Sequence, residues 1–175
     1  MKQIAMRMRS FWLVLVGAML IGIVVAGVQP VLAVSEAQES AVKNNCDSIK
    51  EVLRNVQKDD SRARVHLGAY YEAVLSKFIT PLNVRLVENN LSTASLVENQ
   101  NKFADARDLF ATDFVNYQQG LEELVLMDCH NDSKEFYEKL EKVRQKRKIV
   151  EQDTVKLRGL ITEHIKSVTG LEGKV

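Results

Sequence analysis

Proline is scarce in this chain of 175 residues, which contains only Pro30 and Pro81. From residue 82 to residue 168 there is no proline, and the only glycines are Gly120 and Gly159. Since these two residue types most disfavour a helix interior, this stretch favours long, uninterrupted helices. The sequence also lacks alternating strand patterns, glycine-rich phosphate loops, internal repeats and low-complexity tracts. It therefore predicts an all-α protein.

An excess of positive charge is also lacking. Three of the 24 Lys and Arg residues lie in the first 33 residues, which leaves 21 against 23 Asp and Glu and a net charge near −2 for the rest. A nucleic-acid-binding protein concentrates basic residues on one face, so we expect no nucleic-acid partner. The residues that follow the first 33 are enough for one domain with its own hydrophobic core.

Motifs that carry known chemistry are missing as well. The chain has no His-Glu-x-x-His or Glu-x-x-His metal pattern, no Cys-x-x-Cys-His haem attachment and no Gly-x-Ser-x-Gly nucleophile turn. Its three histidines, His66, His130 and His164, fall at different levels of the expected helices, so they offer no assembly point for a catalytic triad. We therefore expect a protein that is not an enzyme, with no catalytic residue, metal or cofactor.

The first 33 residues have the pattern of an export signal. A basic start precedes an apolar run at residues 11–28, and Val-Leu-Ala at residues 31–33 matches a cleavage site. The run of 18 residues is longer than most cleaved signals and shorter than most membrane spans. We predict either a signal peptide cut after Ala33 or an N-terminal membrane anchor. Both place the rest of the chain outside the membrane, with residues 1–33 as its only membrane contact.

Heptad spacing of apolar residues marks three long helices, at about 46–80, 95–129 and 133–169. In the first, nine of ten slots from Val42 to Val74 are apolar, and in the third, seven of ten from Phe136 to Val168 are apolar. In the second, the slots are Leu96, Phe103, Ala106, Phe110, Phe114, Tyr117, Leu121 and Leu124. A period near 3.5 residues is typical of helices packed as a left-handed bundle or coiled coil.

Short connections and capping residues indicate how these helices are joined. Residues 129–131 leave room only for a tight turn, so the second and third helices must be antiparallel neighbours. Ser95 with Glu98, and Asp132 with Glu135, match the capping-box pattern at two helix starts.

Pro81 interrupts the first helix, because proline removes a helical hydrogen bond and clashes with the preceding turn. We expect this helix to bend or end near Thr80, and residues 82–91 to cross the top as a short capping segment. The fold class expected is an elongated antiparallel three-helix bundle, coiled-coil-like, after an N-terminal signal or anchor helix. Its parts are a polar lead-in at 34–45, the bundle at 46–170 and a tail at 171–175.

The only two cysteines of the chain, Cys46 and Cys129, fall at the same end of this predicted bundle. In an oxidising compartment they should form a disulfide. The alternatives are two free structural thiols or a metal site that adds His130. The metal site lacks a fourth ligand and a closely spaced ligand pair.

Three slots of the predicted core hold an acidic or basic residue. Asp60 and Arg147 stand at matching heights, near Phe114, which predicts an interior ion pair that fixes the register of the helices. The alternative is a ligand or catalytic role for this pair. His164 also falls on a core slot, where a satisfied structural histidine is expected.

Apolar residues are unusually dense between residues 70 and 87. One stripe, Tyr70, Val74 and Phe78, can face the core, and a second stripe is formed by Tyr71, Leu75, Ile79 and Leu82. The second stripe serves either a second neighbouring helix or a surface for an unknown protein partner or self-association.

These features predict an exported, non-enzymatic helical protein that acts as a structural or protein-interaction module of the cell envelope. An alternative is an extracytoplasmic module that binds or senses a small molecule held near Asp60 and Arg147. Such a module should have a cavity at that level, whereas a structural protein should have a filled layer. An enzyme of unknown type would need a polar cleft with converging titratable groups, which the sequence does not suggest.

Overall fold

The computed structural model describes residues 34–91 and 94–171, and every long element among them is a helix. The elements are α2 (Glu36–Asn44), α3 (Cys46–Ala73), the π-helix η1 (Val74–Ile79), α4 (Thr80–Glu88), α5 (Ala94–Leu126) and α6 (Ser133–Thr169). The described residues contain no strand, so the all-α prediction is confirmed. The predicted signal or anchor at 1–33 and most of the predicted tail at 171–175 lie outside the described residues.

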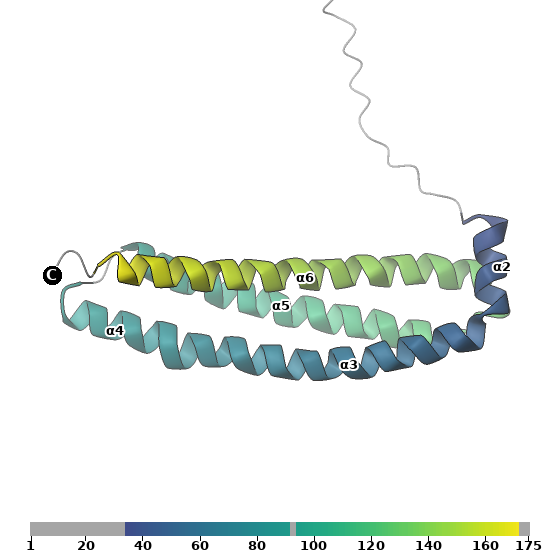
Figure 1. The fold of residues 1–175 in the computed structure, drawn as a ribbon, viewed down its shortest axis with the longest axis horizontal. Coiled ribbons are helices and arrows are strands. Elements are labelled where there is room, and N and C mark those ends of the chain that lie inside the picture. The colour runs from purple at the N-terminus through teal and green to yellow at the C-terminus, as the bar shows by residue number, and fades with distance from the viewer. Residues whose placement is uncertain (1–33, 92–93, 172–175) are drawn as a thin grey trace, which may run out of the picture. The chain divides into compact units, whose positions relative to one another are not determined.

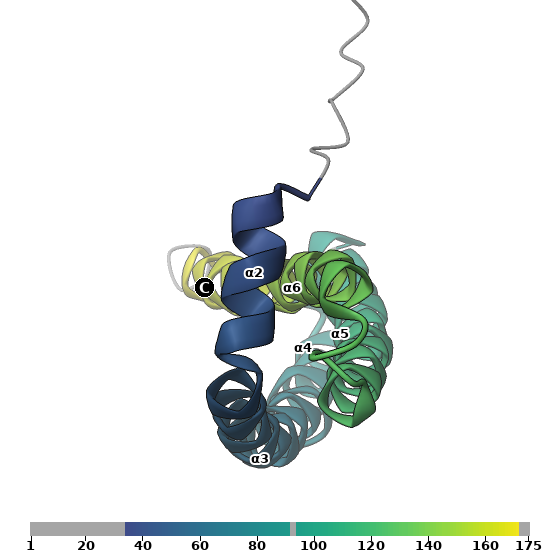
Figure 2. The same cartoon turned by 90° about the vertical axis from the view of Figure 1, so that its right-hand side faces the viewer.

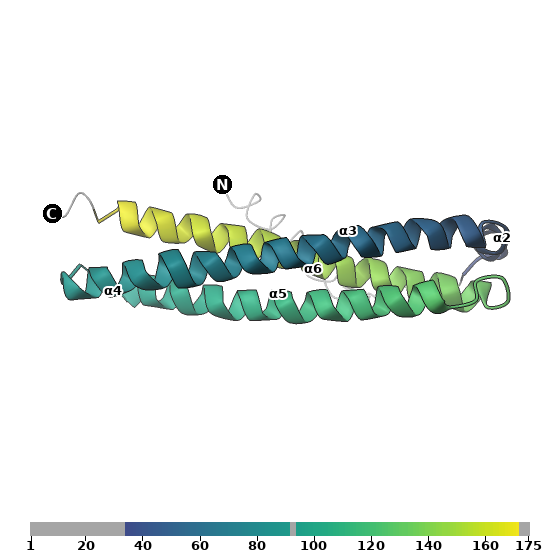
Figure 3. The same cartoon turned by 90° about the horizontal axis from the view of Figure 1, so that it is seen from below.

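Three helical stretches lie side by side along most of their lengths (Figures 1 and 3). The path α3–η1–α4 and helix α6 run in one direction, and α5 runs in the opposite direction (Figure 1). The contact between α5 and α6 is the most extensive, and α3 also packs on α5. We call the end with α2 the proximal end, and the end with α4 and the last turns of α6 the distal end (Figure 1).

Helix α5 supplies most of the core. Every predicted core residue of this helix is buried: Leu96, Phe103, Ala106, Phe110, Phe114, Tyr117, Leu121 and Leu124. Tyr71, Phe110 and Phe114 form a chain of edge-to-face ring contacts, with centroids 5.3 and 5.5 Å apart. Such pairs stabilise a core beyond the apolar area they bury.

Residues 34–45, predicted as a polar lead-in, form a helix of their own that crosses the proximal end (Figure 2). Ser35 and Gln38 make a capping box at the start of this helix, and Val42 is its buried residue. Asn45, with φ −114° and ψ 16°, separates α2 from α3, and its side-chain amide donates to the Ala41 carbonyl. This local hydrogen bond competes with a continuous helix and explains the change of direction.

The first long helix does not end at Thr80, although its geometry changes there from a π-helix to an α-helix, and residues 82–91 do not form a separate cap. The helical path continues from Cys46–Ala73 through η1 to Glu88 and curves gently (Figure 1). Pro81 lies in the first turn of α4, directly after the π-helix. The wider π turn makes room for the proline ring, and the first turn of a helix tolerates a missing N–H.

The other helix boundaries are closer to the prediction. Helix α5 ends three residues before the expected Cys129, and the observed α6, Ser133–Thr169, has the expected bounds. The side chain of Asp132 makes no cap hydrogen bond, so the predicted capping box with Glu135 is not formed. Its backbone, with φ −115° and ψ 39°, departs from the extended conformation that a capping box requires.

Candidate functional site

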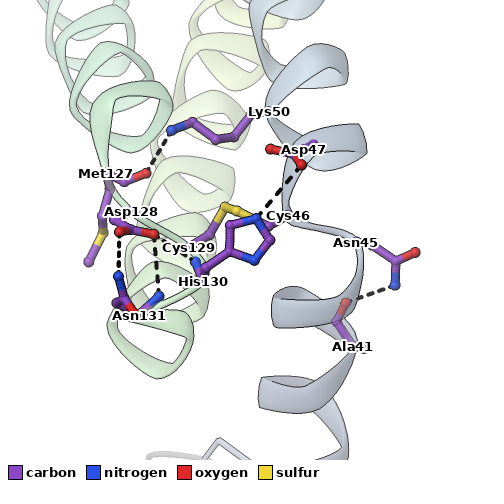
Figure 4. Close-up of a disulfide and its surroundings, with 10 residues drawn as sticks. All are labelled: Ala41, Asn45, Cys46, Asp47, Lys50, Met127, Asp128, Cys129, His130 and Asn131. Carbon is purple, nitrogen blue, oxygen red and sulfur yellow. Dashed lines mark hydrogen bonds and ion pairs between the residues drawn. A yellow bond between two sulfur atoms is a disulfide. The ribbon is translucent and has the colours of Figure 1, made fainter.

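The two cysteines form a disulfide at the proximal end, as the sequence predicted (Figure 4). Their Cα atoms are 5.5 Å apart, and both residues are buried. The bond joins the first residue of α3 to the turn between α5 and α6. Free thiols are therefore ruled out at these two positions.

Polar groups surround the disulfide on the solvent side (Figure 4). The Lys50 ammonium donates to the Met127 carbonyl at 2.9 Å, and His130 Nε2 lies 3.7 Å from Asp47 Oδ2. Asp128 accepts hydrogen bonds from the Asn131 side chain and from the backbone N–H groups of His130 and Asn131, which lower the pKa of this carboxyl. These bonds hold the turn that positions Cys129.

The alternative metal site acquires one further possible ligand, Asp47, but its cysteine is no longer available as a thiolate ligand. Ligand atoms of Cys46, Asp47 and His130 lie within 4.8 Å of one another. The Cys46 sulfur, however, belongs to the disulfide. Because zinc takes a thiolate rather than a disulfide sulfur, this set does not offer zinc its usual ligands.

Asp60 and Arg147 are brought together near the middle of the helices. Arg147 Nη2 lies 3.5 Å from Asp60 Oδ1, and the Tyr117 hydroxyl donates to Asp60 Oδ2 at 2.7 Å. The Arg147 side chain is 51% exposed and that of Asp60 is 18% exposed, so the pair lies at the edge of the core and not in its interior. The long arginine side chain reaches the solvent while its stem stays on the helix surface.

Tyr117 is the member of this group that the sequence reasoning missed. Its pKa is raised, chiefly by burial and then by its hydrogen bond to Asp60. A tyrosine on a core slot needs a partner for its hydroxyl, so this signal was present in the sequence. The group is a structural link between α3, α5 and α6, with Asp60 as the acceptor.

The sequence also did not predict that two acidic residues, Asp153 on α6 and Asp113 on α5, lie close together. Asp153 is buried, and its pKa is raised first by burial and second by the nearby charge of Asp113. Asp153 falls outside the heptad slots, so the pattern gave no sign of its burial.

Buried amides connect the helices at the distal end. Asn83 Nδ2 on α4 donates to the Leu96 carbonyl and to Gln100 Oε1 on α5, at 3.1 and 2.8 Å. Asn99 Nδ2 on α5 donates to the Leu160 carbonyl on α6 at 3.4 Å. These bonds fix α4 and α6 against α5.

His164 is buried on α6 as expected, but it is not satisfied. The residue is 4% exposed, and neither ring nitrogen has a hydrogen-bond partner among the described residues. Its pKa is lowered by burial, which favours the neutral ring.

The second apolar stripe faces neighbouring helices, which is one of its two expected roles, and it does not form an exposed partner surface. Tyr71 and Ile79 are buried, and Leu75 and Leu82 are half-buried. Tyr70 and Phe78, expected in the core, are instead 52% and 66% exposed. The reason is a register shift, because the core side of this path follows steps of four residues, Leu67, Tyr71, Leu75, Ile79 and Asn83. Consecutive steps of four break a heptad, and the π turn in this segment keeps them on one face.

Two grooves open at the distal end. The first, between α3–η1–α4 and α6, has a volume of about 450 Å³, and we call it the His164 groove. Its lining consists of Tyr70, Val74, Phe78, Ile79, Leu82, Ile161, His164 and Ile165. The second, between α4 and α5, has a volume of about 260 Å³, and we call it the valine groove after Val84, Val87 and Val97 in its lining.

A third groove lies at the proximal end between α2, α3 and α6, with a volume of about 520 Å³. Its lining is largely apolar and includes Val42, Leu53 and Leu140. Gln38 Nε2 in this lining donates to the Tyr137 hydroxyl at 2.7 Å, so the polar groups of these two side chains already have a partner.

The residues singled out from the sequence therefore have three outcomes. The two cysteines form a disulfide, Asp60 and Arg147 form a pair at the edge of the core, and the apolar stripe expected as a possible partner surface is largely buried. Among residues 34–91 and 94–171, no helix combines the length and apolar character needed to cross a membrane. Comparisons with protein-family models, with curated proteins and with solved structures gave no match to this chain.

Proposed function

We propose that this chain is an exported, non-enzymatic antiparallel three-helix bundle that acts as a structural or protein-interaction module of the cell envelope. Export is supported by the basic, apolar and small-residue pattern of residues 1–33, whether that segment is cleaved near Ala33 or kept as an anchor. The Cys46–Cys129 disulfide agrees with an oxidising compartment.

The observation that carries the interaction role is the exposed apolar surface of the distal end. Val84 and Val87 on α4 are 51% and 56% exposed, and Val97 on α5 is 45% exposed. All three line the valine groove. Neighbouring apolar side chains on an open surface favour a protein partner or a second copy of the chain.

A non-enzymatic role is supported by the placement of the titratable groups. Asp60 is hydrogen-bonded to Tyr117, Asp153 lies beside Asp113, and His164 lines the His164 groove at the distal end. These groups belong to different levels of the helices, so they do not converge on one point as general acid–base chemistry requires.

The test of the interaction role is affinity capture from envelope fractions with wild type and with the double variant Val84→Ser/Val87→Ser. Val65→Ser/Val155→Ser is the matched control, because these valines, on α3 and α6, are similarly exposed, at 64% and 68%, and line none of the three grooves. We expect the distal variant to lose the captured protein, or to lose self-association in light scattering, while the control keeps it. Equal behaviour of the two double variants would count against the proposal.

Export is tested separately by adding protease to cells whose outer envelope has been permeabilised while the cytoplasmic membrane stays intact. The body should be degraded from outside, and the mass of the intact protein should show whether it starts at Val34. A protected body would refute the export proposal whichever fate residues 1–33 have.

A second candidate function is extracytoplasmic binding or sensing of a small molecule. The specific observation in its favour is the His164 groove, whose mostly apolar lining includes a buried polar ring that has no hydrogen-bond partner within residues 34–91 and 94–171. This site differs from the one expected from the sequence, since Asp60 is already bonded to Tyr117 and Arg147 is half exposed.

A further inference from the structure

We propose that the His164 groove binds a small apolar molecule that carries one hydroxyl group, with the His164 ring as the hydrogen-bond partner of that hydroxyl. The inference rests on the second function proposed above and specifies the chemistry of its ligand.

The groove exists because the two helical stretches on either side of it pack more closely on α5 than on each other. At the distal end this leaves an opening of about 450 Å³ between η1 and α6. Volumes of 300–1,000 Å³ are typical of small-molecule sites, and such sites are mostly apolar with a few placed polar groups. The His164 groove matches this description in its size and in its lining.

His164 supplies the polar group. Its ring is buried, and neither nitrogen is hydrogen-bonded within the described part of the chain, although it lines the groove. A neutral imidazole has one N–H donor and one nitrogen acceptor, and leaving both unpaired in an apolar site is unfavourable. A ligand hydroxyl that pairs with one ring nitrogen removes part of this penalty.

The neutral ring also selects the class of ligand. A hydroxyl can accept a hydrogen bond from the ring N–H or donate one to the unprotonated nitrogen. A carboxylate or an ammonium would bring an unpaired charge into apolar walls, which is far more costly than bringing in a hydroxyl. The walls therefore favour an uncharged molecule with an aliphatic or aromatic body.

The rim of the groove is suited to cover such a body. Phe78 is 66% exposed and Tyr70 is 52% exposed, and both belong to the lining. Closing these rings over a bound apolar body would remove their apolar surface from water. Both rings therefore stand where they could cover part of a ligand bound in the groove.

The test uses the exported protein, produced from the full chain, with two probes of equal chain length, 1-octanol and 1-fluorooctane. Unlike the hydroxyl, the carbon-bound fluorine has no donor hydrogen and is a very poor hydrogen-bond acceptor, so only 1-octanol can pair with the ring in either direction. We follow binding by calorimetry, and we follow the His164 ring nitrogens by ¹⁵N NMR. The variants are His164→Leu, which keeps an apolar side chain at this buried position, and Val155→Ser, a control at a 68% exposed position of α6 that is not in the lining.

We expect the affinity for 1-octanol relative to 1-fluorooctane to be about tenfold higher in wild type and Val155→Ser than in His164→Leu, the size of one neutral hydrogen bond. In the wild type, 1-octanol should also shift the His164 nitrogen resonances. A histidine that serves the fold alone would show no such shift.

The proposal is overturned if neither probe binds, if wild type and His164→Leu show the same ratio of affinities, or if binding leaves the His164 resonances unchanged. It is also overturned if the groove is covered by a second copy, seen as a dimer that 1-octanol does not dissociate. None of these results bears on the proposed interaction role, which is tested independently by the Val84→Ser/Val87→Ser variant at the valine groove.

Discussion

Tyr117 and Asp60 are joined by a hydrogen bond of 2.7 Å that ties α5 to α3. The tyrosine is 2% exposed, and its raised pKa keeps the hydroxyl protonated and able to donate at neutral pH. Arg147 lies farther from the same carboxylate, at 3.5 Å, and its side chain is 51% exposed. The carboxylate of Asp60 is therefore more important as the acceptor for the tyrosine than as half of an ion pair.

This relationship predicts unequal losses when the group is dismantled. Asp60→Ala leaves a buried hydroxyl without an acceptor, and we expect it to lower the free energy of unfolding by about 1–3 kcal/mol. Arg147→Ala removes a half-exposed partner and should cost less than about 1 kcal/mol. Chemical denaturation of both variants measures the difference.

Tyr117→Phe provides the control for this prediction. In its background Asp60→Ala no longer orphans a hydroxyl, so the two changes together should cost clearly less than the sum of the single losses. Additive losses, or an arginine variant as damaging as the aspartate variant, would show that the ion pair and not the tyrosine bond holds this layer.

The disulfide carries the second prediction. It joins residues 83 positions apart, and closing a loop of that length stabilises by roughly 4.5 kcal/mol in the chain-entropy model. Cys46→Ser/Cys129→Ser should lower the free energy of unfolding by an amount of that order. Reducing the wild type should produce the same loss without any substitution. Thiol counting on denatured, unreduced protein should find none, and two reactive thiols would refute the bond.

The sequence determined the helices more fully than it determined which faces they bury. In α5, every residue of the expected stripe is buried. Steps of three and four residues alternate along this stripe from Phe103 to Leu124, with one extra step of four between Ala106 and Phe114. In α3 and η1 the rhythm changes after Leu67, and both tyrosines at 70 and 71 are plausible core residues. Only packing against Phe103 and Phe110, which contact the ring of Tyr71, selects between them.

For the polar residues too, the sequence predicted the position along the helix but not the degree of burial or the hydrogen bonding. The Asp60–Arg147 proximity follows from equal heights on two helices, but the exposure of the arginine depends on how far apart the helices lie. The ring of His164 has no hydrogen-bond partner in the described part of the chain because it borders a gap between side chains from η1 and α6, which helical spacing cannot reveal. The sequence located His164 in the core and gave no indication that its nitrogens would be left unpaired.

The third prediction concerns pH. The pKa of Asp153 is raised by burial and then by Asp113, so its contribution to stability is complete below the unfolded-state pKa of 3.8 and is lost as pH rises through the higher folded-state value. Asp153→Asn has no charge to bury. We expect this variant to be more stable than the wild type at pH 7 and to lose that advantage toward about pH 3.

Denaturation series at several pH values test this, with Asp59→Asn as the control, because the Asp59 side chain is 73% exposed. The control should show no comparable gain at neutral pH. A loss of stability for Asp153→Asn at pH 7 would mean that the ionised carboxylate is favoured in the folded protein, which would reverse the sign argued here.

The last prediction tests the register of α3 with two adjacent residues of the same type. Tyr71 is 1% exposed and contacts the rings of Phe103 and Phe110, whereas Tyr70 is 52% exposed. Tyr71→Ala should cost about 3–5 kcal/mol, the range for truncating a large aromatic core residue. Tyr70→Ala should cost less than about 1 kcal/mol, since most of its ring is already in water. Chemical denaturation of the two variants decides between the registers. Equal losses, or a larger loss for Tyr70→Ala, would return Tyr70 to the core as a strict heptad requires. That result would also remove Tyr70 from the rim of the His164 groove, so it would undermine the geometry on which the ligand proposal depends.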